Sequence, residues 1–171
     1  LEALEAIYQG DPNELLDLLG SLVNKSLLRQ VELPEGDVRF FMLETIREYG
    51  WSHARMSNEL EDLVSRYTHY YLALAEEAEP QLTGPEQDFW FDRLESEHDN
   101  LRNALALQLE RQQHSQAARM GAALWRFWYV RNHLSEGRQW FARILQGREN
   151  QIEAGVLARA LIGNGVLAWM Q

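Results

Sequence analysis

The chain has 171 residues, 46% of them hydrophobic and six of them tryptophan, which is enough apolar surface for one compact domain or two small ones. Its 16 Lys and Arg against 26 Asp and Glu give a net charge of −10, which opposes binding to a phosphate backbone. The absence of cysteine excludes disulfides, thiolate nucleophiles and thiolate metal sites, and it fits the reducing cytoplasm, where we expect the chain to reside.

Membrane attachment and export are not expected. No apolar run approaches the roughly 18 residues that span a bilayer. The first residues also lack the basic and apolar regions of a signal peptide. Because the chain does not begin with Met, we expect it to be a segment of a longer protein.

The first third has the order of elements of a winged helix, so we expect a winged-helix-like domain over residues 1–57. Apolar residues at spacings of one, three and four over 13–24, behind the start signal Asp11–Pro12–Asn13, predict an amphipathic helix. Two β-prone runs, 26–33 and 38–43, flank a turn-rich Pro34–Asp37 and predict a hairpin. A further helix is expected over 43–56.

Residues 58–113 are predicted to be linking helices. One helix should place a single apolar stripe toward the core: Leu60, Leu63, Val64, Tyr67, Tyr70, Tyr71 and Leu74. Thr83–Gly84–Pro85 should end it. A second apolar series runs from Phe91 through His98 to Leu105, and Ser96 or Asp99 could cap a helix within it.

Residues 114–171 show a weak internal repeat. The segments ARMGAALWRFW and ALIGNGVLAWM align at an offset of 42 residues, with Gly121 over Gly163, Leu124 over Val166 and Trp128 over Met170. The helix expected over 115–131 is apolar on two adjacent stripes, so it needs neighbours on two sides. The helix expected from about Gln151 is apolar to its end, which indicates a repeat truncated at the C-terminus. The predicted fold is mainly α: a winged helix with one β-hairpin, followed by antiparallel helical hairpins that begin a tetratricopeptide-like solenoid.

Three stretches together resemble a known bacterial assembly: LLDLLGSLVNKSLL, RFFMLETIREYG, and LESEHDNLRNAL with ALWRFWYVRNHLSEGRQWF. They are similar to STAND-type transcriptional regulators, in which an NB-ARC ATPase core precedes a winged helix and tetratricopeptide-like repeats. The resemblance covers nearly the whole chain. It implies that the nucleotide-binding core lies outside this chain and that the chain itself is not an enzyme.

In that family a Met-His-Asp motif after the wing senses the phosphate of bound ADP, and the matching positions here are Met42, Leu43 and Glu44. A leucine side chain cannot donate a hydrogen bond to phosphate, so this nucleotide-sensor equivalent is degenerate. Glu44 either keeps the acid of the motif or simply begins the next helix, where a carboxylate suits the helix dipole. We expect no bound cofactor.

A winged helix often reads DNA with its second helix in the major groove. Here that helix carries Asp11, Glu14 and Asp17 early, and Lys25 and Arg29 lie beyond its end. Residues 1–60 contain five Lys and Arg against eleven Asp and Glu. We therefore expect docking within the parent protein rather than direct nucleic-acid binding by this segment.

Residues 114–148 combine six arginines and a single acidic residue with six aromatic side chains. The functional interpretation is a surface for an acidic peptide, a nucleotide or a nucleic acid, built from Arg forks and aromatic stacking. The candidate residues are Arg119, Trp125, Arg126, Tyr129, Arg138 and Trp140. In the simpler interpretation the aromatics form the core between helices and the arginines face solvent or pair with acidic residues of 56–113.

No catalytic or metal site is predicted. The five histidines show no HxxxH or HxH spacing, and His98, on an apolar stripe, fits a hydrogen-bonded core histidine. Carboxylate pairs such as Glu76 with Glu77 and Glu95 with Glu97 fit solvent-facing helix surfaces, and neither a phosphate loop nor a nucleophile motif accompanies them.

Two hypotheses follow. The first is a non-catalytic signal-relay and protein-interaction segment, with the parent's ATPase core as one partner and a protein or small-molecule inducer on the repeats as the other. The alternative is a DNA-binding winged-helix transcription factor with a helical dimerisation arm.

Overall fold

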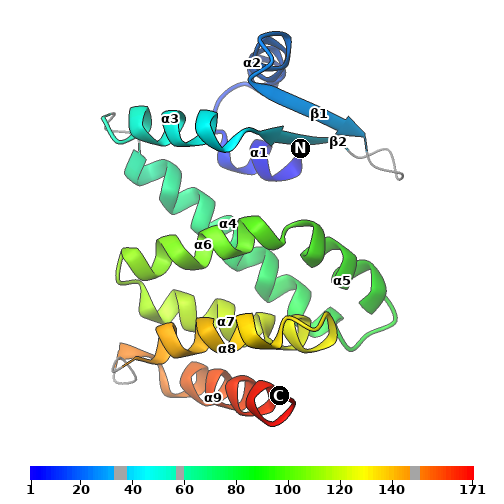
Figure 1. Ribbon diagram of the computed structural model, residues 1–171, viewed down its shortest axis with the longest axis vertical. Coiled ribbons are helices and arrows are strands. Elements are labelled where there is room, and N and C mark those ends of the chain that lie inside the picture. The colour runs from blue at the N-terminus through cyan, green and yellow to red at the C-terminus, as the bar shows by residue number, and fades with distance from the viewer. Residues whose placement is uncertain (33–37, 57–59, 147–150) are drawn as a thin grey trace. The chain divides into compact units, whose positions relative to one another are not determined.

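A computed structural model describes residues 1–32, 38–56, 60–146 and 151–171. Within these ranges the chain forms nine helices and one two-stranded antiparallel hairpin, so the predicted mainly α class with one hairpin is confirmed (Figure 1). None of the described helices is both long and apolar enough to cross a bilayer.

The chain divides into two compact units, unit 1 over Leu1–Tyr70 and unit 2 over Tyr71–Gln171. The boundary lies inside one continuous helix, α4 (Leu60–Gln81). The division into domains 1–57, 58–113 and 114–171 stays a prediction.

Unit 1 begins with α1 (Glu2–Ile7) and α2 (Pro12–Asn24). The expected start signal is confirmed, because the Asp11 carboxylate caps α2 by accepting a hydrogen bond from the Asn13 backbone N–H at 2.8 Å. Pro12 occupies the first turn, where its missing N–H costs no helical hydrogen bond. Leu15 and Leu19, one turn apart, are buried, so the amphipathic pattern places one face of α2 in the core.

The hairpin consists of β1 (Leu28–Glu32) and β2 (Val38–Met42), paired antiparallel from Leu28 opposite Met42 to Glu32 opposite Val38. The expected turn at Pro34–Asp37 lies outside the described residues. Helix α2 packs against β1, and α3 (Glu44–Ala54) follows β2 after one residue. The predicted order of helix, hairpin and helix is therefore present in unit 1.

Three helices end on a non-glycine residue in the left-handed conformation: Ser26 with φ 58°, Gln112 with φ 59° and Asn132 with φ 62°. In each case the N–H of the next residue donates back across the last turn, from Leu27 to Leu22 O, from Gln113 to Gln108 O and from His133 to Trp128 O. These bonds satisfy carbonyls that the helix end leaves open and stop the helix there. They fix short connections after α2, α6 and α7.

Unit 2 continues α4 and adds α5 (Gln87–Ser96) and α6 (His98–Glu110). The apolar series from Phe91 to Leu105 is divided by a helix break between α5 and α6, near the predicted caps Ser96 and Asp99. Neither candidate forms the cap: Glu97 occupies that position without a side-chain cap bond, and Ser96 Oγ donates to Arg93 O instead. Those predicted caps were wrong because both short side chains engage their own helix turns, Asp99 by accepting from Arg102.

The predicted core stripe of α4 was partly wrong. Leu63 is more than a third exposed, whereas Val64, Tyr71 and Leu74 are buried as expected. Burial instead follows a face that also includes Leu72, the small residues Ala75 and Ala78, and the polar Thr68. Thr68 can lie on this face because its hydroxyl donates to Val64 O one turn back, at 2.9 Å.

A large part of the core of unit 2 lies between α7 (His114–Val130), α8 (Leu134–Leu145) and α9 (Ala154–Trp169), which all pack on one another (Figure 1). Helix α7 also contacts α6, so its two apolar stripes have the two neighbours that the sequence required. The largest fully buried side chains include Phe127, Trp128 and Phe141. Trp128 and Phe141 meet edge to face at 5.7 Å.

Glycines set the close approach of these helices. A Cβ on Gly137 of α8 would lie 2.6 Å from Leu167 and 2.8 Å from Trp128, and one on Gly163 of α9 would lie 2.7 Å from Trp125. Because real Cβ atoms do not approach so closely, a side chain at either position would push the helices apart. The sequence repeat aligned Gly163 with Gly121, and Gly121 likewise faces Ile144 and Phe141 of α8.

The rest of the repeat alignment is less symmetrical. Leu124 and Trp128 are fully buried, but Val166 is half-buried and Met170 is exposed just beyond the end of α9. The shared glycines thus have similar packing roles, while the aligned apolar positions do not share one environment.

Candidate functional site

The predicted nucleotide-sensor equivalent lies at the junction of β2 and α3. Met42 ends β2, Leu43 is 68% exposed, and Glu44 is the first residue of α3. Glu44 Oε1 accepts a hydrogen bond from Arg47 Nη2 at 2.6 Å, one turn along the same helix. This geometry matches the helix-start interpretation of Glu44.

The exposed face of α2 is apolar and acidic. Leu16 and Leu18 are 50% and 49% exposed, and Glu14 and Asp17 lie beside them in the helix. Glu14 Oε2 accepts a hydrogen bond from the Tyr8 hydroxyl at 3.1 Å. The pKa of Tyr8 is raised, mainly by desolvation and secondly by this hydrogen bond to Glu14. With no Lys or Arg between Pro12 and Asn24, this face offers nothing to neutralise a phosphate.

The six residues of the predicted interaction surface do not form one patch. Trp125 and Arg126, consecutive on α7, line a cleft, whereas Trp140 is buried and donates its indole N–H to Glu136 at 3.2 Å. Arg138 donates to the Gln171 side chain at 2.8 Å. The remaining two are Arg119, held in an ion pair, and Tyr129, 37% exposed.

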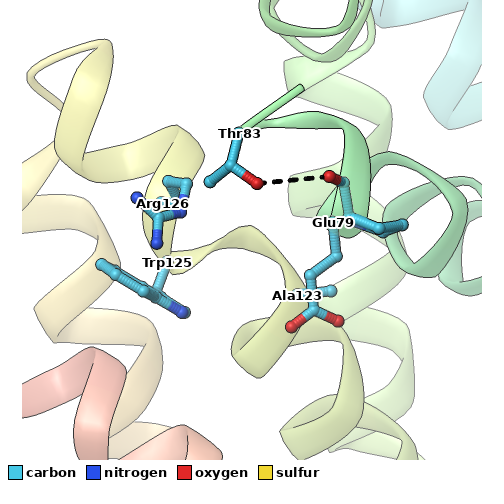
Figure 2. A pocket seen from close by; sticks show the side chains of 6 residues that line it. Glu79, Thr83, Ala123, Trp125 and Arg126 are labelled. Atoms are coloured by element: carbon cyan, nitrogen blue, oxygen red, sulfur yellow. Dashed lines mark hydrogen bonds between the residues drawn. The ribbon is translucent and has the colours of Figure 1, made fainter. Parts of the chain in front are cut away.

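The cleft in unit 2 has a volume of about 350 Å³ and lies between the end of α4 and the middle of α7 (Figure 2). It is lined by Glu79, Pro80, Thr83, Ala123, Trp125 and Arg126. The Arg126 guanidinium lies 4.7 Å from the centre of the Trp125 ring, and both side chains lie opposite Glu79 in Figure 2. The cleft therefore presents the aromatic face of Trp125 and the cation of Arg126. The carboxylate in the cleft, Glu79, is already paired with Arg159 of α9.

Other arginines of the 114–148 block form internal ion pairs. Arg119 donates through Nε and Nη2 to the two carboxylate oxygens of Glu76, both at 2.7 Å, and Arg131 pairs with Asp92. The hydrogen bonds to Glu76 raise the pKa of Arg119 despite partial burial. The simpler interpretation of the block, pairing with acidic residues earlier in the chain, holds at these two positions.

Glu136 of α8 is the centre of a polar cluster in unit 2. Arg102 of α6 donates to both of its oxygens at 2.8 and 2.5 Å, and His98 Nε2 lies 3.1 Å from Oε1. Burial alone would raise the pKa of Glu136, but hydrogen bonds from Arg102, His98 and Trp140 and the His98 charge outweigh it and hold that pKa well below its usual range. His98 is thus a buried, hydrogen-bonded histidine, as the sequence indicated.

Sequence reasoning missed a neighbouring group of side chains. Glu95, His98 and His133 each bring one potential ligand atom within 4.8 Å of the others. Glu95 and His98 flank the break between α5 and α6, and His133 lies 35 residues further along at the start of α8. No local spacing motif could have indicated this, because the turn after α7 brings the second histidine into place.

Comparison with known proteins adds a resemblance at the level of sequence. The chain is 34% identical over 177 aligned residues to "Putative HTH-type transcriptional regulator Rv0890c" of Mycobacterium tuberculosis and to "Putative HTH-type transcriptional regulator Mb0914c" of Mycobacterium bovis. The alignment covers 99% of this chain and 20% of each relative, so the chain spans about a fifth of their length. No family model matches the chain. No solved structure matches it either.

Proposed function

We propose that this chain is a non-catalytic regulatory segment of a bacterial DNA-binding transcriptional regulator. The observation that carries the proposal is the alignment of nearly the whole chain with proteins named as HTH-type transcriptional regulators. The attribution to the STAND type, with an NB-ARC core as a partner, rests on the sequence stretches quoted above. This regulatory role is the basis for the expected cytoplasmic location.

Within this role, the Trp125–Arg126 cleft is the recognition site of unit 2. Arg126 is a candidate donor to an anionic group, and the Trp125 ring offers a face for a flat or apolar one. The inducer or partner is therefore expected to combine both features. Binding would favour one arrangement of the helices that line the cleft, and α4 runs from there without interruption into unit 1.

A reporter gene controlled by the complete regulator tests this role. Arg126→Glu reverses the charge in the cleft, and we expect it to abolish the response to inducing conditions while the amount of protein stays unchanged. Arg143→Glu is the matched control, because Arg143 stacks on Trp140 at 4.6 Å in the same manner but does not line the cleft. Equal responses from the two variants would contradict a recognition role for the cleft.

A second candidate function is direct DNA binding by unit 1. It is favoured by the order of helix, hairpin and helix in that unit. The relatives' names also fit a DNA-binding winged-helix regulator more closely than a relay. The charge of α2 is the observation against it, since its exposed face carries Glu14 and Asp17 and no cation.

Fluorescence anisotropy with labelled upstream DNA at low salt separates the two functions. For the relay role we expect no binding by the 171-residue chain above that of a non-specific acidic protein. For the DNA-binding role we expect binding that Lys25→Glu with Arg29→Glu removes, because these are the cations nearest the end of α2. Arg47→Glu with Arg55→Glu, at exposed positions of α3 and just beyond its end, serves as the charge-matched control.

A further inference from the structure

We propose that Glu95, His98 and His133 form a binding site for a divalent transition-metal ion of the zinc class. The site goes beyond the regulatory role proposed above and does not depend on it. Two imidazoles and one carboxylate are a donor set that zinc accepts in proteins, with a fourth position open to water or another ligand.

The geometry is close to that of a bound site. The three potential ligand atoms lie within 4.8 Å of one another, whereas ligands around tetrahedral zinc lie about 3.3 Å apart, given a bond of about 2.0 Å. Binding an ion therefore requires the three side chains to move toward one another. His133 Nε2 already lies 3.1 and 3.2 Å from the two Glu95 oxygens, and the two imidazole rings are 4.3 Å apart between centres.

The surroundings supply an orienting carboxylate. Metal-bound histidines commonly donate their other ring N–H to a carboxylate, which fixes the ring and makes it a better ligand. Glu136 would have this relation to His98 when His98 binds the metal through Nδ1, because Glu136 Oε1 lies 3.1 Å from the other ring nitrogen, Nε2. Because Glu136 is also held by Arg102 and Trp140, we place it outside the ligand set, as the group that positions His98.

Charge also favours a cation here. The cluster brings together three carboxylates, Glu95, Asp99 and Glu136, and Arg102 bonds to the last two. A metal binds imidazole in its neutral form, so three carboxylates and one Arg102 guanidinium leave negative charge that a bound divalent ion would offset. A bound ion would join the break between α5 and α6 to the turn before α8, which lies 35 residues further along the chain.

Equilibrium dialysis of the untagged, chelator-treated 171-residue chain against ZnCl2 tests the site, with metal measured by elemental analysis and MgCl2 as the hard-cation control. We expect one zinc per chain and no magnesium. We also expect cobalt, used as a probe, to give the visible absorption of tetrahedral coordination. Zinc should raise the melting temperature of the chain.

Two ligand variants and a matched control decide the outcome. His133→Ala and Glu95→Gln should each weaken zinc binding by more than the roughly 10–100-fold that loss of an outer-shell partner costs. His69→Ala removes an exposed histidine of α4 and should change nothing. Equal zinc binding by the original chain and both ligand variants, or no binding by any, would overturn the proposal and leave a hydrogen-bonded cluster of histidines and carboxylates.

Discussion

Units 1 and 2 use the same amphipathic patterns but bury them to different extents. In unit 2 the helices α7 and α8 bury large aromatic and aliphatic side chains completely, and cross-helix ion pairs surround that core. In unit 1, α3 has no buried residue, and large apolar side chains such as Leu16, Leu43 and Met56 are exposed. A helical pattern in the sequence therefore predicts a helix in both units, but it does not predict how much of its apolar face finds a partner.

The largest expected effect is in the core of unit 2. Phe141→Ala removes a fully buried ring that packs on Trp128, and we expect it to lower the free energy of unfolding by about 3–5 kcal/mol. Phe89→Ala, at a ring that is more than half exposed, should change it by less than about 0.5 kcal/mol. Urea unfolding of the two variants would measure the difference, and similar costs would mean that unit 2 lacks the core described.

The next effect concerns the glycines between helices. Gly163→Ala places a methyl group against Trp125 and should destabilise the chain by about 1–3 kcal/mol. Gly165→Ala, two residues along the same helix with nothing within 4 Å, should stabilise it by up to about 1 kcal/mol. Opposite shifts in melting temperature are expected, and shifts of the same sign would show that α9 does not pack closely on α7.

A smaller effect separates the two kinds of ion pair. Glu136→Gln removes a half-buried carboxylate that accepts from three side chains, and we expect a loss of about 2 kcal/mol. Glu44→Gln in unit 1 breaks an exposed pair with Arg47 and should cost less than about 0.5 kcal/mol. Chemical unfolding of both variants tests this ranking. If they cost the same, the cluster around Glu136 contributes no more than a surface pair.

The smallest effect is at the left-handed helix ends. Ser26→Gly relieves a conformation that L side chains adopt at a cost, and we expect it to stabilise unit 1 by about 0.5–1 kcal/mol. Asn132→Gly in unit 2 should gain less, because asparagine tolerates this conformation. Circular dichroism melts compare the two, and a destabilising Ser26→Gly would contradict the backbone geometry.

Local features were predictable from the sequence. The Asp11 cap, the hairpin and the extent of α7 all depend on neighbouring residues, and the structure confirms them. Long-range contacts were not predictable in the same way. The pairing of Arg119 with Glu76 joins residues 43 positions apart, and the pattern of the chain indicated only that acidic and basic blocks could pair.

The candidate sites show the same division. Trp125 and Arg126 were predicted as interaction residues from the arginine- and aromatic-rich block 114–148, and because they are consecutive on α7 they line the cleft together. His98 and His133 come together because of the direction that the chain takes at the turn after α7. The spacing of histidines in the sequence does not predict that direction.

The distribution of tryptophan gives the two units different optical signatures. Five of the six tryptophans belong to unit 2, and Trp51 alone belongs to unit 1. Intrinsic fluorescence therefore follows the melting of unit 2, while far-ultraviolet circular dichroism sums the helices of both units. Trp169 is 84% exposed and Trp128 is 1% exposed, so an aqueous quencher reaches Trp169 and does not reach Trp128. Unfolding curves from the two probes will separate if the units melt independently and will coincide if they melt together.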